Sequence, residues 1–162
     1  MQVWISKTLT AIVVMGSLSA AVEYAAQNES GASPRLEADK KWFALKPDQL
    51  KWTKNPDGSG REGSVVFGDR SKPQLFGYLV KWPPNTIAKA HSHPDDRYAV
   101  VLSGTFYHGH GRKFDPGSLE RLSRGTFFSE PANVPHYGAT KDEETILYFV
   151  GIGPDRREEV EK

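Results

Sequence analysis

The apolar and polar positions along the chain form short runs separated by turn residues. From residue 65 onward, apolar or alternating segments recur at 65–68, 75–82, 88–94, 97–103, 105–111, 127–131 and 145–153. Branched and aromatic residues are common in these segments, and glycine, proline and aspartate lie between many of them. Short strands at such spacing predict an all-β sandwich or barrel.

One short helix is expected among the strands, at residues 114–125. Asp115 and Pro116 suit an N-cap followed by proline at the first helical position, and Gly125 suits the end of the helix. The charged segment 154–162 predicts a solvated or disordered tail beyond the barrel.

Residues 1–26 predict a secretory signal peptide. Lys7 precedes an apolar run from Leu9 to Val14, and small residues follow with the spacing that signal peptidase prefers, so cleavage near Ala21 or Ala26 is expected. The alternative is a membrane anchor, but the run falls short of the ~20 residues that a span needs. The mature chain is therefore expected to be periplasmic or secreted, with no stable membrane anchor after cleavage.

Residues 27–63 predict a linker and an N-terminal strap ahead of a barrel at 64–153. The start of this stretch is polar and contains glycine and proline, as flexible linkers do. Trp42 and Phe43 follow in a mostly polar context, and we expect them to pack against the domain. The aromatic segment 75–84 and Trp42 together suggest the surface of a possible homodimer.

The composition of the chain limits the partners and the metal ligands that the protein can have. The chain has 162 residues, which fits one domain, and its 21 basic and 20 acidic residues leave a net charge of +1. No strong field is available to attract nucleic acid, so no nucleic-acid partner is expected. The chain has no cysteine, which excludes disulfides, thiolate metal sites and cysteine nucleophiles. Any bound metal must be held by histidine, aspartate or glutamate, with or without water.

Two of the five histidines, His91 and His93, lie two residues apart in one predicted strand. Alternate side chains of a strand share a face, so their Cβ atoms lie roughly 7 Å apart, close enough to bind one ion through bonds of ~2.1 Å. The candidate for a third ligand is His136, which follows Pro135 in a stretch stiffened by two prolines.

These residues resemble the cupin superfamily, which has two sequence motifs. His91, His93 and Gly104 match the first motif, in which His-x-His precedes a glutamate and a glycine. The second motif, in which glycine and proline precede a histidine, is matched at full spacing by Gly125, Pro131 and His136. The resemblance covers roughly residues 64–153. It implies a cupin-type β-barrel, the double-stranded β-helix or jelly roll, and a divalent metal ion (Fe, Mn, Ni or Zn).

The chain departs from the cupin pattern at four positions. Asn85 and Asn133 replace glycines, which asparagine does at low cost because it tolerates the left-handed backbone conformation. Thr140 replaces the final asparagine of the second motif. Arg97 stands where the family has its glutamate ligand, and an arginine cannot bind a cation. Either the metal remains on His91, His93 and His136, or the metal is absent and only the barrel persists; the retained histidines favour the first interpretation.

The next predicted strand, 105–111, could supply a fourth ligand. If Ser103 and Gly104 form a two-residue hairpin turn, Ala99 pairs with His108 and Arg97 with His110. Cross-strand partners share a face, so both histidines would point inward with the others. We expect His110 to be a ligand or a hydrogen-bond donor behind the ligands, and His108 to be a weaker candidate; the alternative is a solvent-facing strand at the barrel rim.

Arg97 needs an anion beside it if a divalent ion is close. Asp95, Asp96, Glu130 or a substrate carboxylate could supply one, and a salt bridge to Asp96 at the barrel mouth is the leading interpretation. Tyr98, Tyr107 and Tyr137 flank the proposed ligands, and we take Tyr98 and Arg97 as the candidate catalytic residues. The alternative for each tyrosine is a role in lining the site.

The resemblance and the open coordination positions favour a metal-dependent enzyme that acts on a small oxygenated organic molecule. A dioxygenase is the leading subclass, because Fe(II) with imidazole ligands and free positions can bind oxygen and a chelating substrate. A metal-dependent isomerase, lyase or cyclase is the alternative within enzymes. If the protein is not an enzyme, the alternative is a non-catalytic module that senses a small ligand or a metal.

Overall fold

A computed structural model of the protein describes residues 42–161. The predicted signal peptide at 1–26 and the start of the linker lie outside the described residues. Within residues 42–161, no helix is both long enough and apolar enough to cross a membrane. The elements in chain order are η1 (Pro47–Gln49), β1 (Thr53–Lys54), β2 (Glu62–Phe67), β3 (Leu75–Trp82), β4 (Ile87–Ser92), β5 (Arg97–Ser103), β6 (Thr105–His110), η2 (Pro116–Ser118), β7 (Glu120–Ser123), β8 (Phe127–Glu130), β9 (His136–Ala139), β10 (Thr145–Ile152) and β11 (Glu158–Glu159).

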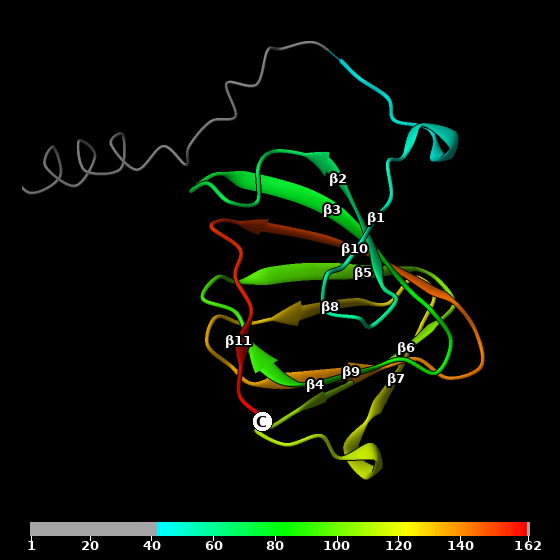
Figure 1. The fold of residues 1–162 in the computed structure, drawn as a ribbon, viewed down its shortest axis with the longest axis vertical. Helices are drawn as coiled ribbons and strands as arrows, with labels where there is room; N and C mark the ends of the chain where they lie inside the picture. Colours follow the sequence, from blue (N-terminus) through cyan, green and yellow to red (C-terminus); the bar gives the residue numbers. More distant parts are fainter. Residues whose placement is uncertain (1–41, 162) are drawn as a thin grey trace, which may run out of the picture. The chain divides into compact units, whose positions relative to one another are not determined.

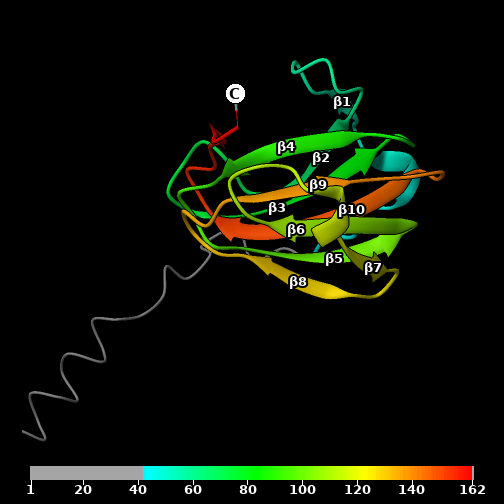
Figure 2. The ribbon, with the colours of Figure 1, turned by 90° about the horizontal axis from the view of Figure 1, so that it is seen from below.

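The strands form two antiparallel sheets that face one another. One sheet has the order β1-β2-β3-β10-β5-β8 and the other has the order β11-β4-β9-β6-β7. The two sheets lie as stacked layers in Figure 1, and Figure 2 shows the same layers from below. This arrangement confirms the predicted all-β fold of the double-stranded β-helix type.

The inward side chains of the two sheets make the apolar core. Trp82 of β3 meets Phe106 of β6 edge-on with ring centroids 5.0 Å apart, which joins the two layers. Burying a large apolar side chain stabilises a fold by about 1.5–3 kcal/mol. Along β5 the buried positions are Arg97, Ala99 and Val101, so the core is apolar at one end of this strand and charged at the other. The buried core residues are Phe76, Tyr78, Val80, Trp82, Ala88, Ala99, Val101, Phe106, Leu122, Leu147 and Phe149.

Most predicted strands are present, and the two asparagine substitutions behave as expected. The segments 75–82 and 97–103 have the bounds of β3 and β5, whereas β7 and β9 were not predicted as strands. Asn85 and Asn133 have φ angles of 55° and 61°, the left-handed conformation in which glycine stands in the family pattern.

The helix predicted at 114–125 is wrong. Asp115 does cap a turn, since its carboxylate accepts the Gly117 N–H, but that turn is a 3-10 helix of 3 residues. The next residues form β7, which pairs with β6. Leu122 is the one buried residue of β7, and a single inward side chain suits an edge strand better than a helix. Gly125, with φ of 85°, lies between β7 and β8.

The predicted hairpin between β5 and β6 is also wrong. β5 pairs with β10 and β8, whereas β6 pairs with β7 and β9. The chain crosses from one sheet to the other at Gly104, which has φ of 72° and whose added Cβ would lie 2.4 Å from the Glu144 carbonyl oxygen. His108 and His110 therefore have Gly138 and His136 of β9 as partners, in place of Ala99 and Arg97.

The charged C-terminal segment is part of the barrel, which corrects the expectation for 154–162. β11 pairs with β4 and lies beside it in Figure 1. The backbone N–H groups of Val160 and Glu161 each donate to the Ala90 carbonyl, at 3.0 Å. This segment covers the outer edge of β4, which would otherwise expose unpaired backbone groups.

Among the described residues of the predicted strap, 42–63, the last part packs against the barrel. β1 pairs with β2, and the Lys81 ammonium lies 4.4 Å from the centre of the Trp52 ring. Trp42 and Phe43 are 89% and 62% exposed, so the expectation that they pack is wrong. Most of β3 is buried inside the first sheet, so segment 75–84 does not offer the aromatic dimer surface that its sequence suggests.

Candidate metal centre

His91, His93 and His136 converge at one end of the barrel. β4 and β9 are paired strands, and His91 lies directly opposite His136. Between Ala88 and His91, β4 has one more residue than β9, and such a bulge changes which residues of a strand point inward. Pro135 precedes β9 and restricts the approach to His136.

The three imidazoles form a compact buried group. Ring centroids are 4.5 Å apart for His91 and His136, 5.1 Å for His91 and His93, and 5.4 Å for His93 and His136. One nitrogen from each ring lies within 4.8 Å of the other two. The side chains come from separate segments of the chain, so the group depends on the pairing of β4 with β9.

Backbone carbonyls fix the orientation of all three rings. The Nδ1 atoms of His91, His93 and His136 lie 2.7, 2.6 and 3.0 Å from the carbonyl oxygens of Lys89, Arg156 and Val134. A carbonyl only accepts, so Nδ1 carries the proton and donates it. In a neutral ring this leaves the Nε2 lone pair free, which is the tautomer that histidine ligands of metals commonly have.

His91 and His93 are held in the neutral form. Burial, with help from the Arg157 charge, lowers the pKa of His91 from 6.5 to about 2. Burial also lowers the pKa of His93. Neutral imidazoles are the form that binds a cation.

The residues of this group fit a divalent metal ion. The Nε2 atoms of His93 and His136 are buried and have no hydrogen-bond partner among the described residues. An unpaired buried polar atom costs free energy, so a bound cation would give these lone pairs a partner. Imidazole suits Zn, Fe and Ni, and a cupin-type set of three histidines leaves further positions for substrate or water.

Arg97 is buried inside the barrel, not at its mouth. It is 4% exposed, and its guanidinium forms an ion pair with Glu130 and a hydrogen bond of 3.3 Å to the Tyr78 hydroxyl. The expected salt bridge to Asp96 is wrong, because Asp96 accepts the Ala132 N–H at 2.8 Å instead. Of the anions considered for Arg97, Glu130 is the one that the structure brings to it.

Glu130 lies opposite Arg97 on the paired strand β8 and faces the histidines. Its carboxylate oxygens are 3.4 Å from Nε2 of His136 and 3.7 Å from Nε2 of His108. Burial opposes ionisation of this carboxyl, but the Arg97 guanidinium beside it and the two imidazoles hold the pKa of Glu130 well below its usual range. Glu130 is therefore a buried carboxylate.

Asp155 links the C-terminal segment to the site, and no sequence motif pointed to it. One carboxylate oxygen lies 3.5 Å from Nδ1 of His93 and 3.5 Å from a guanidinium nitrogen of Arg97, and the other forms an ion pair with Arg70. Burial alone would raise the pKa of Asp155, but His93 and the two arginines lower it. The residue follows β10 in a segment whose charge had suggested a solvated tail.

Of the two histidines of β6, the structure brings His108 into the site. His108 is 6% exposed and, together with Glu130 and His136, offers ligand atoms within 4.8 Å of one another. His110 lies opposite His136 on the paired strand, but its side chain is exposed and joins none of the three groups of close ligand atoms in the described part of the chain. The expected preference for His110 over His108 is thus reversed.

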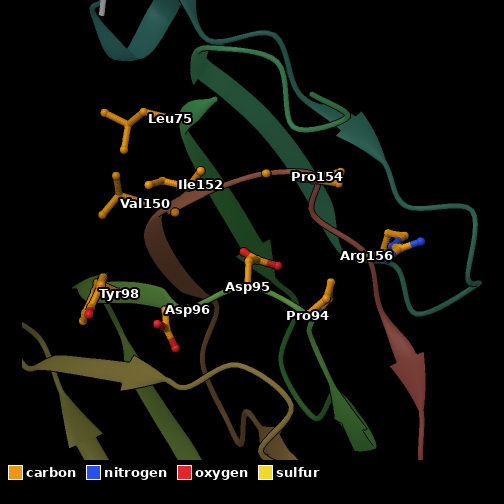
Figure 3. Close-up of a pocket in the computed structure, with 11 residues that line it drawn as sticks. Leu75, Pro94, Asp95, Asp96, Tyr98, Val150, Ile152, Pro154 and Arg156 are labelled. Atoms are coloured by element: carbon orange, nitrogen blue, oxygen red, sulfur yellow. The ribbon is translucent and has the colours of Figure 1, made fainter. Parts of the chain in front are cut away.

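Tyr98 lies on the other side of the sheet from the histidines. It alternates with Arg97 and Ala99 on β5, so it points outward, where it is 45% exposed and stacks on Phe127 at 6.0 Å. Figure 3 shows Tyr98 beside an outer pocket of about 550 Å³ that Leu75 and Val150 also line. A catalytic role for Tyr98 at the metal centre is therefore wrong.

The other two flanking tyrosines have packing contacts of their own. Tyr137 packs over Gly109, meets Phe114 at 5.4 Å and contributes to the wall of the cavity that the histidines line. The Lys141 ammonium lies 4.3 Å from the centre of the Tyr107 ring.

The histidines open into a separate cavity of about 360 Å³ between the sheets. Its wall combines aromatic rings with charged groups, so it suits a small polar molecule better than a purely apolar one. The arginines that line it are Arg61, Arg70, Arg97, Arg156 and Arg157. Its acidic residues are Asp57, Glu130 and Asp155.

Two antiparallel sheets with converging histidines between them are the architecture of a cupin. The chain belongs to the family of ChrR cupin-like domains, whose model matches residues 40–155. A comparison with curated proteins gives no match.

Solved structures agree with this assignment at the level of the fold. The polyketide cyclase RemF from Streptomyces resistomycificus has a TM-score of 0.61 and 16% identity, covering 75% of this chain and 87% of its own. KdgF from Halomonas sp. has a TM-score of 0.53 and 19% identity, covering 68% and 95%. A cupin-superfamily sugar phosphate isomerase from Silicibacter pomeroyi has a TM-score of 0.53 and 15% identity, covering 68% and 76%.

Proposed function

We propose that the protein is an exported, metal-dependent cupin enzyme that acts on a small oxygenated organic molecule, with dioxygenase chemistry as its leading subclass. The observation that carries the proposal is the set of three buried imidazoles whose Nδ1 atoms are all used by carbonyls and whose Nε2 atoms face a shared cavity. The bound ion would be Fe, Mn, Ni or Zn, and it would supply a Lewis acid or, if iron, a binding position for oxygen.

The chain's own residues would bind and orient the substrate. The cavity contains five arginines and three acidic residues, and arginine suits oxygen anions such as carboxylates or enolates. Arg61 lies 4.5 Å from the centre of the Trp82 ring, so a flat substrate would meet both a charged and an aromatic surface there. Glu130 is a buried carboxylate of this cavity, and its ion pair with Arg97 contributes to the charged surface that a substrate would meet.

An oxygen-uptake assay on protein loaded with Fe(II) tests the subclass. Dicarbonyl compounds and aromatic acids form the substrate panel, and the same protein loaded with Zn is the control, because zinc does not change its oxidation state. Oxygen consumption with Fe(II) and a panel member would support a dioxygenase. Turnover with both metals and no oxygen consumption would favour the second candidate.

The second candidate is a metal-dependent isomerase, lyase or cyclase. It is supported by similar folds in a protein named as a polyketide cyclase and in one named as a sugar phosphate isomerase, at 16% and 15% identity. A tightly held ion with no turnover in either assay would instead favour a module that binds a ligand or a metal without catalysis.

Export and self-association complete the proposal. Export is supported by the signal-peptide pattern of residues 1–26, and N-terminal sequencing of the protein from periplasmic or culture fractions would find cleavage near Ala21 or Ala26.

A homodimer is supported by the outward aromatic pair Tyr98 and Phe127, which are 45% and 64% exposed. Sedimentation analysis measures this, and a monomer at micromolar concentration would contradict it.

A further inference from the structure

We propose that Glu130 is a metal ligand of this site and replaces the glutamate that the cupin pattern has at position 97. The inference rests on the proposed metal-binding function and goes beyond it, because it assigns the carboxylate donor to a strand and a motif that do not supply it in the family pattern. Arg97 then acts as a positioning residue that holds the carboxylate of Glu130.

The first support is the register of the two strands. Arg97 of β5 and Glu130 of β8 are direct cross-strand partners. Such partners point to the same face with Cβ atoms about 4.5–5.5 Å apart, so a carboxylate at position 130 enters the same inner space as one at position 97. The chain therefore keeps a buried glutamate in this part of the barrel and moves it by one strand.

The second support is the distance from Glu130 to the histidine group. The separation of 3.4 Å between its carboxylate and Nε2 of His136 is long for a hydrogen bond, whose usual length is about 2.9 Å. Two ligand atoms at ~2.1 Å from one ion lie about 3.4 Å apart when the bond angle is tetrahedral. The Nε2 atom of His136 has no other partner among the described residues, so the observed spacing fits two ligands of one ion. Glu130 joins His108 and His136 in one group of close ligand atoms, and His136 is the ring that this group shares with His91 and His93.

The third support is the balance of charge around Arg97. A carboxylate that binds a cation neutralises less of the charge of its arginine partner. Arg97 has a second anion nearby, because Asp155 lies 3.5 Å from its guanidinium, and the Tyr78 hydroxyl accepts a further hydrogen bond from it. Arg97 therefore remains paired while Glu130 binds the ion, which a lone buried ion pair would not allow.

His108 strengthens the assignment. Its Nε2 atom is buried and unpaired, and it lies 3.7 Å from the other carboxylate oxygen of Glu130. A structural salt bridge between Arg97 and Glu130 would not need two unpaired imidazoles aimed at the same carboxylate. Unpaired imidazoles near the carboxylate are expected if Glu130 belongs to a metal site, because imidazole ligands surround the ion that the carboxylate binds.

The test measures Co²⁺ affinity and the visible absorption of bound Co²⁺ in the full chain. Glu130→Gln keeps the shape of the side chain and removes the charged donor, and we expect it to weaken Co²⁺ binding by at least about tenfold and to shift the absorption bands. Glu143→Gln, at an exposed position, is the matched control and should change neither. Near-UV circular dichroism checks that each variant is folded.

The exchange variant R97E/E130R is the sharper experiment. It returns the glutamate to the family position and leaves the ion pair reversed, so we expect it to bind Co²⁺ more tightly than Glu130→Gln. If Glu130→Gln does not fold, Glu130→Asp gives the answer, because it keeps the charge but shortens the reach and should weaken binding.

The outcomes separate this inference from the proposed function. Folded wild-type protein that binds no Co²⁺ would overturn both. Wild-type protein that binds Co²⁺, loses it in His136→Ala and keeps full affinity and an unchanged spectrum in Glu130→Gln would overturn only the assignment of Glu130.

Discussion

Nδ1 of His93 lies 3.5 Å from the carboxylate of Asp155, although Asp155 belongs to the segment that follows the last long strand. The same Nδ1 atom lies 2.6 Å from the carbonyl oxygen of the next residue, Arg156. The orientation of one proposed ligand is thus set by the C-terminal segment. Outer contacts of this kind affect metal affinity even though they do not touch the ion.

Replacing Asp155 should weaken metal binding without removing a ligand. We expect Asp155→Asn to lower metal affinity by about 10-fold to 100-fold, because His93 loses an anion that supports it and Arg97 loses a partner. Competition with a chelator measures the change. Asp142→Asn, at an exposed position, is the control, and equal affinities for both variants would contradict the role given to Asp155.

Replacing His136 should abolish metal binding. We expect His136→Ala to purify with little or no metal, because this ring belongs to two of the three groups of close ligand atoms among the described residues. Elemental analysis beside the wild type measures the metal content. His110→Ala should retain the ion, since the exposed His110 side chain lies outside all three groups; metal loss in that variant would restore His110 as a ligand.

The contact between Gly138 and Phe106 should tolerate no added methyl group. A Cβ at Gly138 would lie 2.4 Å from the Phe106 ring, which is itself buried in the core. We expect Gly138→Ala to lower the free energy of unfolding by about 1–3 kcal/mol, as overpacking does. Urea denaturation measures this, with Gly63→Ala as control, because the nearest atom to a Cβ there is 3.7 Å away.

Removing the last strand should destabilise the barrel. A chain that ends at Arg157 loses β11 and the two hydrogen bonds to the Ala90 carbonyl. We expect the free energy of unfolding to fall by at least about 2 kcal/mol, because these two hydrogen bonds contribute about 1 kcal/mol each and the pairing of β11 with β4 and the bond from the Phe114 N–H to Glu161 are lost as well. Thermal unfolding measures it, and an unchanged midpoint would show that β11 contributes nothing to stability.

The ionisation of Asp57, in the loop between β1 and β2, should make the free energy of unfolding depend on pH. Burial would raise the pKa of Asp57, but hydrogen bonds from Ser59 and Arg61 lower it from 3.8 to about 2. The ionised carboxylate therefore stabilises the fold above about pH 4, and this stabilisation is lost as the pH falls toward about 2.

At pH 7, Asp57→Asn should lower the free energy of unfolding by less than about 1 kcal/mol, because the pair is partly exposed. The difference from wild type should shrink as the pH falls below about 4. Urea titrations at several pH values measure it. Ser59→Ala should reproduce part of the effect, and a difference that grows toward acid would contradict the assignment.

The two motifs predicted the fold and the three histidines because their spacing reflects local geometry. A spacing of two residues predicted that His91 and His93 lie together, and they do although β4 ends at Ser92. Glycine or asparagine at a turn reflects a left-handed backbone. Arg97 was recognised as the anomaly for the same reason. The partners of Arg97 were not predicted. Glu130 reaches Arg97 through the pairing of β5 with β8, and Asp155 reaches it because the C-terminal segment folds back onto the site, and no local sequence pattern encodes either contact.

The wrong predictions came from ambiguous local signals. Gly104 fits a hairpin turn and also fits a crossing between two sheets, and only the crowding by Glu144 distinguishes them. An aspartate followed by proline begins a long helix or a single turn equally well. High charge predicts solvent exposure for an isolated segment, but two charged strand residues can still add to an open edge, as Glu158 and Glu159 do.

The pairing of β4 with β9 has a kinetic consequence. His91 and His136 become neighbours only when these two strands have joined, and the chain between them must first fold into four other strands that belong to both layers. Contacts between such distant segments form late and slowly in β-proteins. During refolding from denaturant in the presence of Co²⁺, the visible absorption of bound Co²⁺ should therefore appear after most secondary structure has re-formed. The absorption would then report on the final step of assembly.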